Sequence, residues 1–226
     1  MRIIGHRGAA GYAPENTLES FELAIRQGVS MIELDIHRCA IGELVVIHDE
    51  LLDRTTNGKG LVADMTWEEL KELNAGGGNR IPLLAEVLDA VHGRVKINIE
   101  LKGQNVASSL ALLLQQYISQ HDWQADDFYV SSFDHPQLKQ FHGLFPQLRI
   151  GILYESYPTN YLVLSKETDA ASINLSVHFC SKDLISEIHN NGLEVWVYTV
   201  NESDVYEKLN NWGVDAVFTN YPDRFL

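Results

Sequence analysis

The feature that most constrains the fold of this chain is a regular alternation of short apolar runs with amphipathic segments. Apolar runs of a few residues, bounded by turn-forming residues, are typical of buried parallel strands. Eight such runs are present, at Arg2–Gly5, Met31–Asp35, Val95–Leu101, Phe128–Ser132, Arg149–Leu153, Ser172–Leu175, Glu194–Thr199 and Ala216–Asn220. The sequence therefore predicts eight parallel strands.

Helical patterns lie between most of these runs. The segment Thr17–Gln27 repeats apolar residues at helical spacing and is followed by Gly28, a common helix terminator. Further helices are predicted at Leu84–Val91, Val106–Ile118, Pro136–Phe141, Thr159–Lys166, Lys182–Asn190 and Glu202–Asn210. Strands that alternate with helices form parallel βαβ units, and eight of them in 226 residues favour a closed α/β barrel of the (β/α)8 TIM type.

One stretch interrupts the alternation and predicts a hairpin. Between Met31–Asp35 and the apolar run Leu44–Ile47 there are too few residues for the helical crossover that a parallel pair needs. Leu44–Ile47 should therefore return antiparallel through a turn near Ala40–Ile41. This return brings His48 back beside the second strand.

The segment Glu50–Arg80 fits no barrel element. We interpret it as a small insertion with a short helix at Trp67–Leu73, and long ordered loops of this kind are often functional. No linker divides the chain, so we expect residues 1–226 to form a single domain.

The composition limits the partners of such a protein. Its formal net charge is −14, and an acidic surface repels nucleic-acid backbones and anionic membranes. No stretch resembles a signal peptide or a membrane span, so we expect a soluble cytoplasmic protein. Cys39 and Cys180 do not make a disulfide scaffold or a zinc cluster. The sequence leaves homo-oligomer formation open.

Acidic side chains near the ends of the first barrel strands are the main functional signal, because barrel enzymes place their chemistry there. Glu33 and Asp35 are two residues apart on one strand and share a face, and Glu100 lies similarly on the next barrel strand. Inward carboxylates are costly unless they are neutralised. Three oxygen donors without a cysteine suit Mg²⁺, Mn²⁺ or Ca²⁺. The alternative is pairing of these acids with Arg7, Lys102 or Arg38.

Two histidines and two basic residues converge on the same face. His6 ends the first strand and His48 ends the hairpin, and histidine is the usual general acid or base near neutral pH. Arg7 and Lys102 supply the local positive charge that a phosphate group needs on an acidic protein. Together with a metal they predict phosphate chemistry. The alternatives are structural histidines and simple charge balance.

These residues belong to a series of motifs that resembles the glycerophosphodiester phosphodiesterase family over more than 200 residues. Each motif is short, and their complete order is what makes the resemblance specific. The series comprises Gly5–Gly8 (GHRG), Ala13–Thr17 (APENT), Glu33–Ile36 (ELDI), Val45–Asp49 (VVIHD), Asp53–Gly58 (DRTTNG), Ile81–Leu83 (IPL), Asn98–Lys102 (NIELK), Trp196–Asn201 (WVYTVN) and Thr219–Pro222 (TNYP). Two departures, Tyr198 within the usual W-T-V-N ending and Pro82-Leu83 in place of P-T, bear on the alcohol pocket.

The resemblance implies a barrel hydrolase that converts glycerophosphodiesters to sn-glycerol 3-phosphate and an alcohol such as choline, ethanolamine or glycerol. It implies that Glu33, Asp35 and Glu100 bind one divalent cation, and that His6 and His48 act as general acid and base. It further implies contacts to phosphate or substrate from Arg7, Lys102, Asn16 and Trp196.

Several alternatives stay open from the residues alone. The nucleophile is either water or the substrate's own glycerol hydroxyl, and either histidine can be the acid. Asn16, followed by Glu19, can instead cap a helix. A related barrel acting on lysophospholipids or phosphoinositides is disfavoured because no apolar lip or basic membrane face is evident. A non-catalytic barrel that binds phosphorylated ligands is disfavoured by the two histidines beside the acids.

Overall fold

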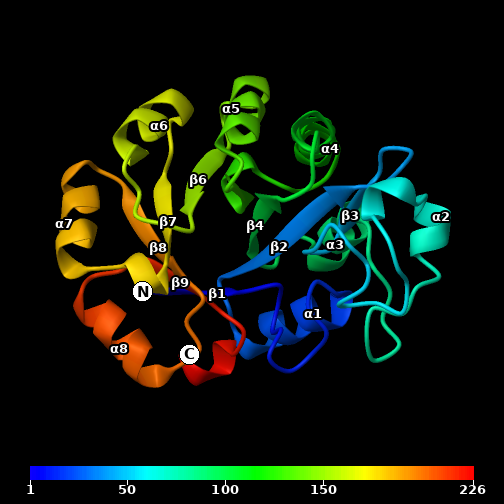
Figure 1. The fold of residues 1–226 in the computed structure, drawn as a ribbon, viewed down its shortest axis with the longest axis horizontal. Helices are drawn as coiled ribbons and strands as arrows, with labels where there is room; N and C mark the ends of the chain where they lie inside the picture. Colours follow the sequence, from blue (N-terminus) through cyan, green and yellow to red (C-terminus); the bar gives the residue numbers. More distant parts are fainter.

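The computed structural model describes residues 1–226, and its central feature is a closed ring of eight parallel strands surrounded by helices (Figure 1). Each ring strand pairs with its two neighbours, and the β1–β2 pairing closes the ring. The ring contains β1 (Arg2–Gly5), β2 (Met31–Arg38), β4 (Lys96–Leu101), β5 (Phe128–Ser132), β6 (Arg149–Tyr154), β7 (Ser172–Ser176), β8 (Glu194–Tyr198) and β9 (Ala216–Thr219). The predicted (β/α)8 barrel is confirmed.

Helices cover the outside of the ring and enclose the main apolar core between themselves and the strands. The helices are α1 (Leu18–Gln27), α2 (Trp67–Leu70), α3 (Leu84–Val91), α4 (Ala107–Gln120), α5 (His135–Leu144), α6 (Tyr161–Thr168), α7 (Lys182–Asn190) and α8 (Ser203–Asn211), with short 3₁₀ turns η1 (Val62–Asp64), η2 (Ala125–Asp127), η3 (Val177–Phe179) and η4 (Pro222–Arg224). All predicted helices are present; Leu84–Val91 and Lys182–Asn190 have the predicted ends, and the others are shifted at one end or both. No helix combines the length and the apolar character needed to cross a membrane.

The predicted hairpin is present and lies outside the ring. Strand β3 (Leu44–Val46) pairs antiparallel with the end of β2, with Ile36 opposite Val46. The turn is closed by a hydrogen bond from the Gly42 amide to the Cys39 carbonyl, and Gly42 has a φ of 111°, which suits glycine. The chain thus reverses without a helix, as the short spacing required.

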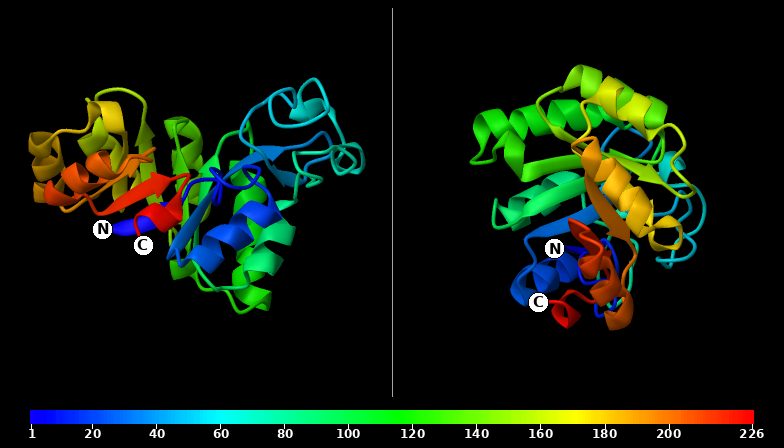
Figure 2. Two further views of the ribbon diagram at one scale, coloured as in Figure 1. Left: turned by 90° about the horizontal axis from the view of Figure 1, so that it is seen from below. Right: turned by 90° about the vertical axis from the view of Figure 1, so that its left-hand side faces the viewer.

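The insertion forms a small structure of its own beside the hairpin. Its apolar side chains, among them Leu52, Val62, Leu70 and Ile81, pack in a cluster that includes Val45 of β3. Figure 2 shows this part, drawn in cyan, extending beyond one edge of the ring. The segment carries a short helix, which ends at Leu70 and not at Leu73, and its apolar core anchors it to the hairpin that carries His48.

The inside of the ring is divided into an apolar half and a polar half. An apolar cluster fills the N-terminal half of the strands, and its members are Ile4, Met31, Tyr129, Trp196, Ala216 and Phe218. Above this cluster, nearer the C-terminal ends, the inward residues are polar, for example Glu33 and Asn98. The cluster thus forms a floor, and the chemistry of the barrel is confined to the C-terminal side.

Candidate active site

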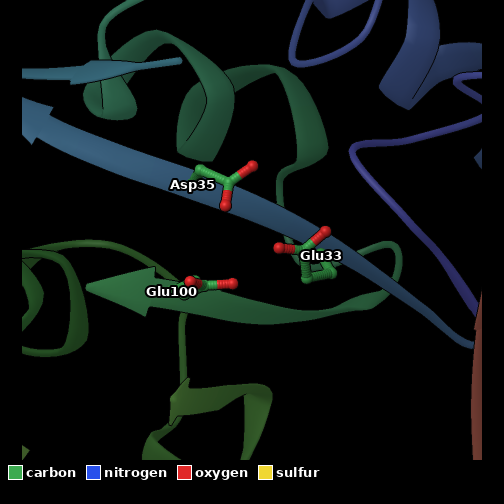
Figure 3. A group of neighbouring side chains, drawn as sticks. All are labelled: Glu33, Asp35 and Glu100. Atoms are coloured by element: carbon green, nitrogen blue, oxygen red, sulfur yellow. The ribbon is translucent and has the colours of Figure 1, made fainter. Parts of the chain in front are cut away.

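Three buried carboxylates meet on the C-terminal side of the ring. The register of β2 and β4 places Asp35 opposite Glu100, while Glu33 lies two residues before Asp35 on the same face. One oxygen from each carboxylate lies within 4.8 Å of the other two. Figure 3 shows the three side chains gathered between the two strands. The geometry that the sequence predicted for these acids is therefore present.

Basic partners neutralise this cluster only in part. Lys102 Nζ donates to Glu100 Oε1 at 2.7 Å, and Arg7 Nε lies 3.3 Å from Asp35 Oδ2. Burial, followed by repulsion from Asp35, still raises the pKa of Glu100 to about 7 and the pKa of Glu33 well above its usual range. Two cations beside three acids leave negative charge uncompensated.

The donor set therefore fits a hard divalent cation. Every donor in the cluster is a carboxylate oxygen, which is the chemistry that Mg²⁺, Mn²⁺ and Ca²⁺ prefer. A bound cation would also supply the charge that Arg7 and Lys102 leave uncompensated. Arg38, the third basic residue considered as a partner, is exposed beside Gly42 at the hairpin turn and pairs with none of these acids.

Asn16 supports this cluster from behind and does not border the cavity. Its side-chain Nδ2 donates to Asp35 Oδ2 at 2.9 Å, and its Oδ1 accepts from the Asp35 amide at 3.3 Å. Thr17, whose side chain accepts from the Ser20 amide, caps α1. Thr17 and not Asn16 therefore caps the helix, and Asn16 orients a carboxylate, while its contact with substrate stays a prediction.

Gly8 explains how the loop after β1 reaches this cluster. Its φ is 84°, and a Cβ there would lie 2.5 Å from the Ser20 carbonyl carbon of α1, so only glycine fits. The close approach holds the preceding residue, Arg7, in a position where its backbone amide donates to Glu33 Oε2 at 2.9 Å. The short motif after β1 thus packs against α1 and the acids together.

The two histidines have chemically different partners. The Nδ1 of His6 lies 2.7 Å from the amide oxygen of Asn220, whereas the Nδ1 of His48 lies 2.5 Å from the carboxylate of Asp49. Burial and the nearby Arg7 lower the pKa of His6 to about 4. Burial also lowers the pKa of His48, against the raising effects of Asp35 and Asp49. An amide and a carboxylate favour different protonation states of the ring.

A second contact fixes the backbone of His48. His37, two residues after Asp35 on β2, donates from Nε2 to the His48 carbonyl at 2.9 Å. The imidazole of His37 is packed against Gly103, the residue that follows Lys102. These contacts connect strand β2 both to the end of the hairpin and to the loop after β4. They therefore fix the position of His48 next to the cavity.

Glu33, Glu100 and the two histidines open into a cavity of about 240 Å³. The lining comprises His6, Arg7, Glu33, His48, Asn98, Glu100, Lys102, Ser131, Phe133, Leu153, Glu155, Tyr198, Thr199 and Phe218. Sequence reasoning missed Phe133, Leu153, Glu155 and Phe218. The first three stand at or just after strand ends, which is the signal that could have found them.

Trp196 lies below the cavity and does not line it. Its side chain is fully buried in the apolar floor, and its indole N–H donates to Glu194 Oε2 at 2.8 Å, toward the N-terminal end of the ring. Tyr198, two residues nearer the strand end, occupies the cavity wall instead. In the structure Trp196 thus lies deeper in the ring than Tyr198, and its contact with substrate stays a prediction.

Comparison with known proteins agrees with this geometry. The family model described as the glycerophosphoryl diester phosphodiesterase family matches residues 6–224. The chain belongs to this family. It is 38% identical to a glycerophosphodiester phosphodiesterase of Bacillus altitudinis, with 99% of the chain and 96% of that protein covered. A Caldanaerobacter subterraneus protein of the same name is 33% identical, with 99% of the chain and 96% of that protein covered.

A solved structure shares the whole fold. A phosphodiesterase from Oleispira antarctica, in complex with its product sn-glycerol-3-phosphate, superposes with a TM-score of 0.92 at 32% identity. The alignment covers 99% of this chain and 94% of that one. Family membership, together with this match, confirms the expected barrel and the expected class of enzyme, a phosphoric diester hydrolase.

Proposed function

We propose that this family member hydrolyses glycerophosphodiesters to sn-glycerol 3-phosphate and an alcohol, with one divalent cation and two histidines. The observation that carries the proposal is the convergence of three kinds of group on one cavity: the buried acids, two basic side chains and two differently partnered histidines. The sn-glycerol-3-phosphate bound in the Oleispira relative supports the same product here. Residues 1–226 act as one domain in this proposal.

Glu33, Asp35 and Glu100 would hold the cation, which when bound would neutralise charge on the phosphate oxygens. Arg7 and Lys102 hold the diester phosphate from the same wall. Arginine presents a planar fork of donors to phosphate, and lysine supplies a compact charge. Both side chains already contact the acids, so they are oriented before substrate arrives.

His6 is the general base in this proposal. The Asn220 amide oxygen can only accept, so the Nδ1 of His6 carries its proton and Nε2 is left with a lone pair. The pKa of about 4 keeps the ring neutral at physiological pH. Nε2 therefore removes the proton from the nucleophile, which is water or the glycerol hydroxyl, as the new P–O bond forms.

His48 is the general acid. The Asp49 carboxylate favours the protonated imidazole through Nδ1, against the burial that lowers the pKa of His48, and the remaining N–H at Nε2 serves the cavity. As the P–O bond to the alcohol breaks, the leaving alkoxide takes the proton from His48. The proton taken by His6 and the proton given by His48 balance over one turnover.

The cavity favours small substrates over lysophospholipids. A volume of about 240 Å³ is below the range of roughly 300–1,000 Å³ that is common for drug-sized ligands. Four of its 14 lining residues are hydrophobic, which provides little surface for an acyl chain. Glycerophosphodiesters with a compact alcohol are therefore the proposed class, without a nucleic-acid or membrane partner.

A coupled assay for glycerol 3-phosphate release tests the proposal, with Mg²⁺, Mn²⁺ or Ca²⁺ and with EDTA. His6→Ala and His48→Ala should each lower kcat on glycerophosphocholine by about 10²–10⁴-fold, because each removes one proton transfer. His121→Ala is the control, since His121 stacks on Tyr117 outside the ring. Full activity of either site variant contradicts the two-histidine mechanism, and undiminished activity in EDTA contradicts the metal.

A further inference from the structure

Arg54 is the side chain by which the insertion reaches the active site. Its guanidinium donates through Nε and Nη2 to Asp49, at 2.6 and 2.9 Å. It also donates through Nη1 and Nη2 to Glu15, at 2.9 and 2.8 Å. The two carboxylates come from different loops, one after β3 and the other after β1. A planar fork that binds both at once fixes their relative orientation.

Each of these carboxylates in turn holds a residue of the cavity. Asp49 bonds His48 Nδ1, and Glu15 accepts from Arg7 Nη1 at 2.7 Å. The charges alternate along the series His48, Asp49, Arg54, Glu15 and Arg7. The members other than Arg54 have only 16–26% of their side chains exposed, so solvent screens them less than it screens open surface pairs.

The electrostatic state of the carboxylates agrees with this arrangement. Hydrogen bonds from Arg54 hold the pKa of Asp49 well below its usual range. Burial would raise the pKa of Glu15, but hydrogen bonds from Arg54 and charge from Arg7 hold it at about 2. Both carboxylates are therefore ionised acceptors, and both are anchored on one guanidinium.

We propose that Arg54 is a positioning residue that aligns His48 as the proton donor, acting through Asp49. This inference rests on the proposed function of His48. Arg54 does not line the cavity and is 48% exposed, so it acts without touching the substrate. Without Arg54, the Asp49 carboxylate is free to turn toward water. The imidazole of His48 then loses the bond that directs its Nε2–H into the cavity.

A matched pair elsewhere in the protein separates this role from an ordinary surface ion pair. Arg94 donates through Nη1 and Nη2 to Glu22 and is 43% exposed, much like Arg54, but it lies after α3 and contacts no group of the site. Exposed ion pairs of this kind contribute little to stability. Arg94→Ala therefore controls for the loss of a guanidinium and its ion pair.

The experiment compares two leaving groups. One diester releases choline, whose alkoxide needs a proton, and the other releases a nitrophenolate, which departs without one. Arg54→Ala should lower kcat on the choline diester by about 10–100-fold, with KM changed less than about twofold. The nitrophenyl diester should retain most of its kcat. Free guanidinium should restore the choline reaction, and Arg54→Lys should restore it in part, because an ammonium cannot bridge both carboxylates.

Equal losses on both diesters, or no loss, overturn the inference, and Arg94→Ala should change neither rate. Failure of the wild-type protein to release glycerol 3-phosphate from any diester contradicts the proposed function instead. The hydrogen bond that orients the His48 imidazole can also be observed in the absence of substrate. It is detected by the ¹⁵N-edited NMR signal of the His48 Nδ1–H proton. This signal should persist in Arg94→Ala and be lost in Arg54→Ala, and its persistence in Arg54→Ala also overturns the inference.

Discussion

At the level of single residues, the energetic cost of this site falls on Glu33 and Glu100. Burial and repulsion from Asp35 raise both of their pKa values, that of Glu100 from 4.5 to about 7. A carboxyl whose pKa is higher in the folded than in the unfolded protein stabilises the fold below the unfolded pKa. That stabilisation is lost as the pH rises through the folded pKa. The free energy of unfolding of the metal-free protein therefore falls as these carboxyls ionise.

We predict that Glu100→Gln increasingly stabilises the metal-free protein as the pH rises from 4.5 to above 7. The gain over wild type should reach the order of 3 kcal/mol, which is the value of the Glu100 shift. His6, whose lowered pKa acts in the opposite sense, is present in both proteins and cancels in the difference. Urea unfolding in EDTA at several pH values measures this difference.

If the gain in stability of Glu100→Gln over wild type did not depend on pH, folding would not raise the pKa of Glu100. Saturating Mg²⁺ provides the internal control, because a bound cation favours the ionised acid and should remove the advantage of the variant. The ionised Glu100 carboxylate that lowers the stability of the metal-free protein is thus the same group that would bind the metal.

The sequence predicted residue types better than residue depth. Glu33, Asp35 and Glu100 were found because inward charges on apolar strands need an explanation. Trp196 shares a face with Tyr198 but lies deeper in the ring, because alternation along a strand says which way a side chain points but not how deep it lies. Asp35 also has a partner, Asn16, that no local pattern reveals, since the two are 19 residues apart.

At the level of elements, the β2–β3 hairpin positions His48, and the loop after β4 holds the hairpin in place. A Cβ at Gly103 would lie 2.9 Å from the Cα and 3.0 Å from the Nδ1 of His37, the residue that binds the His48 carbonyl. Gly103→Ala should therefore destabilise the protein by about 1–3 kcal/mol, because backbone must move. It should also lower kcat, because His48 moves with the hairpin.

Gly143→Ala is the matched control for this change. Gly143 lies in α5, and a Cβ there would have nothing within 4 Å. The substitution should be neutral or stabilise the helix by up to about 1 kcal/mol. Urea unfolding and the glycerol 3-phosphate assay measure both variants. Equal stability of the two variants would show that the loop yields without cost and does not hold the hairpin.

The elements differed in how far the sequence could predict them. The hairpin followed from chain length, since the spacing between Asp35 and Leu44 excludes a crossover. The insertion was recognised because it lacks periodicity, but the same lack left its internal structure undetermined. Its contact with the active site through Arg54 joins residues that are distant in sequence, so only the folded chain reveals it.

At the level of the whole molecule, a net charge of −14 surrounds a site that binds phosphate. Arg7, Lys102 and the cation act at contact distance, whereas the net charge acts at long range on an approaching substrate. The Debye length falls from about 30 Å at 0.01 M salt to about 8 Å at 0.15 M, so salt removes the long-range repulsion first. The two contributions can therefore be separated by ionic strength.

With Mg²⁺ held saturating, added NaCl should raise kcat/KM for a diester with an uncharged alcohol, such as glycerophosphoglycerol, which carries net negative charge. The same salt should leave kcat/KM for glycerophosphocholine nearly unchanged, because its choline cation cancels the phosphate charge. Steady-state rates at both salt concentrations give the ratio directly. A fall in kcat/KM for the anionic diester would instead mean that attraction by Arg7, Lys102 and the cation dominates the approach, and that the acidic surface lies too far from the cavity to oppose it.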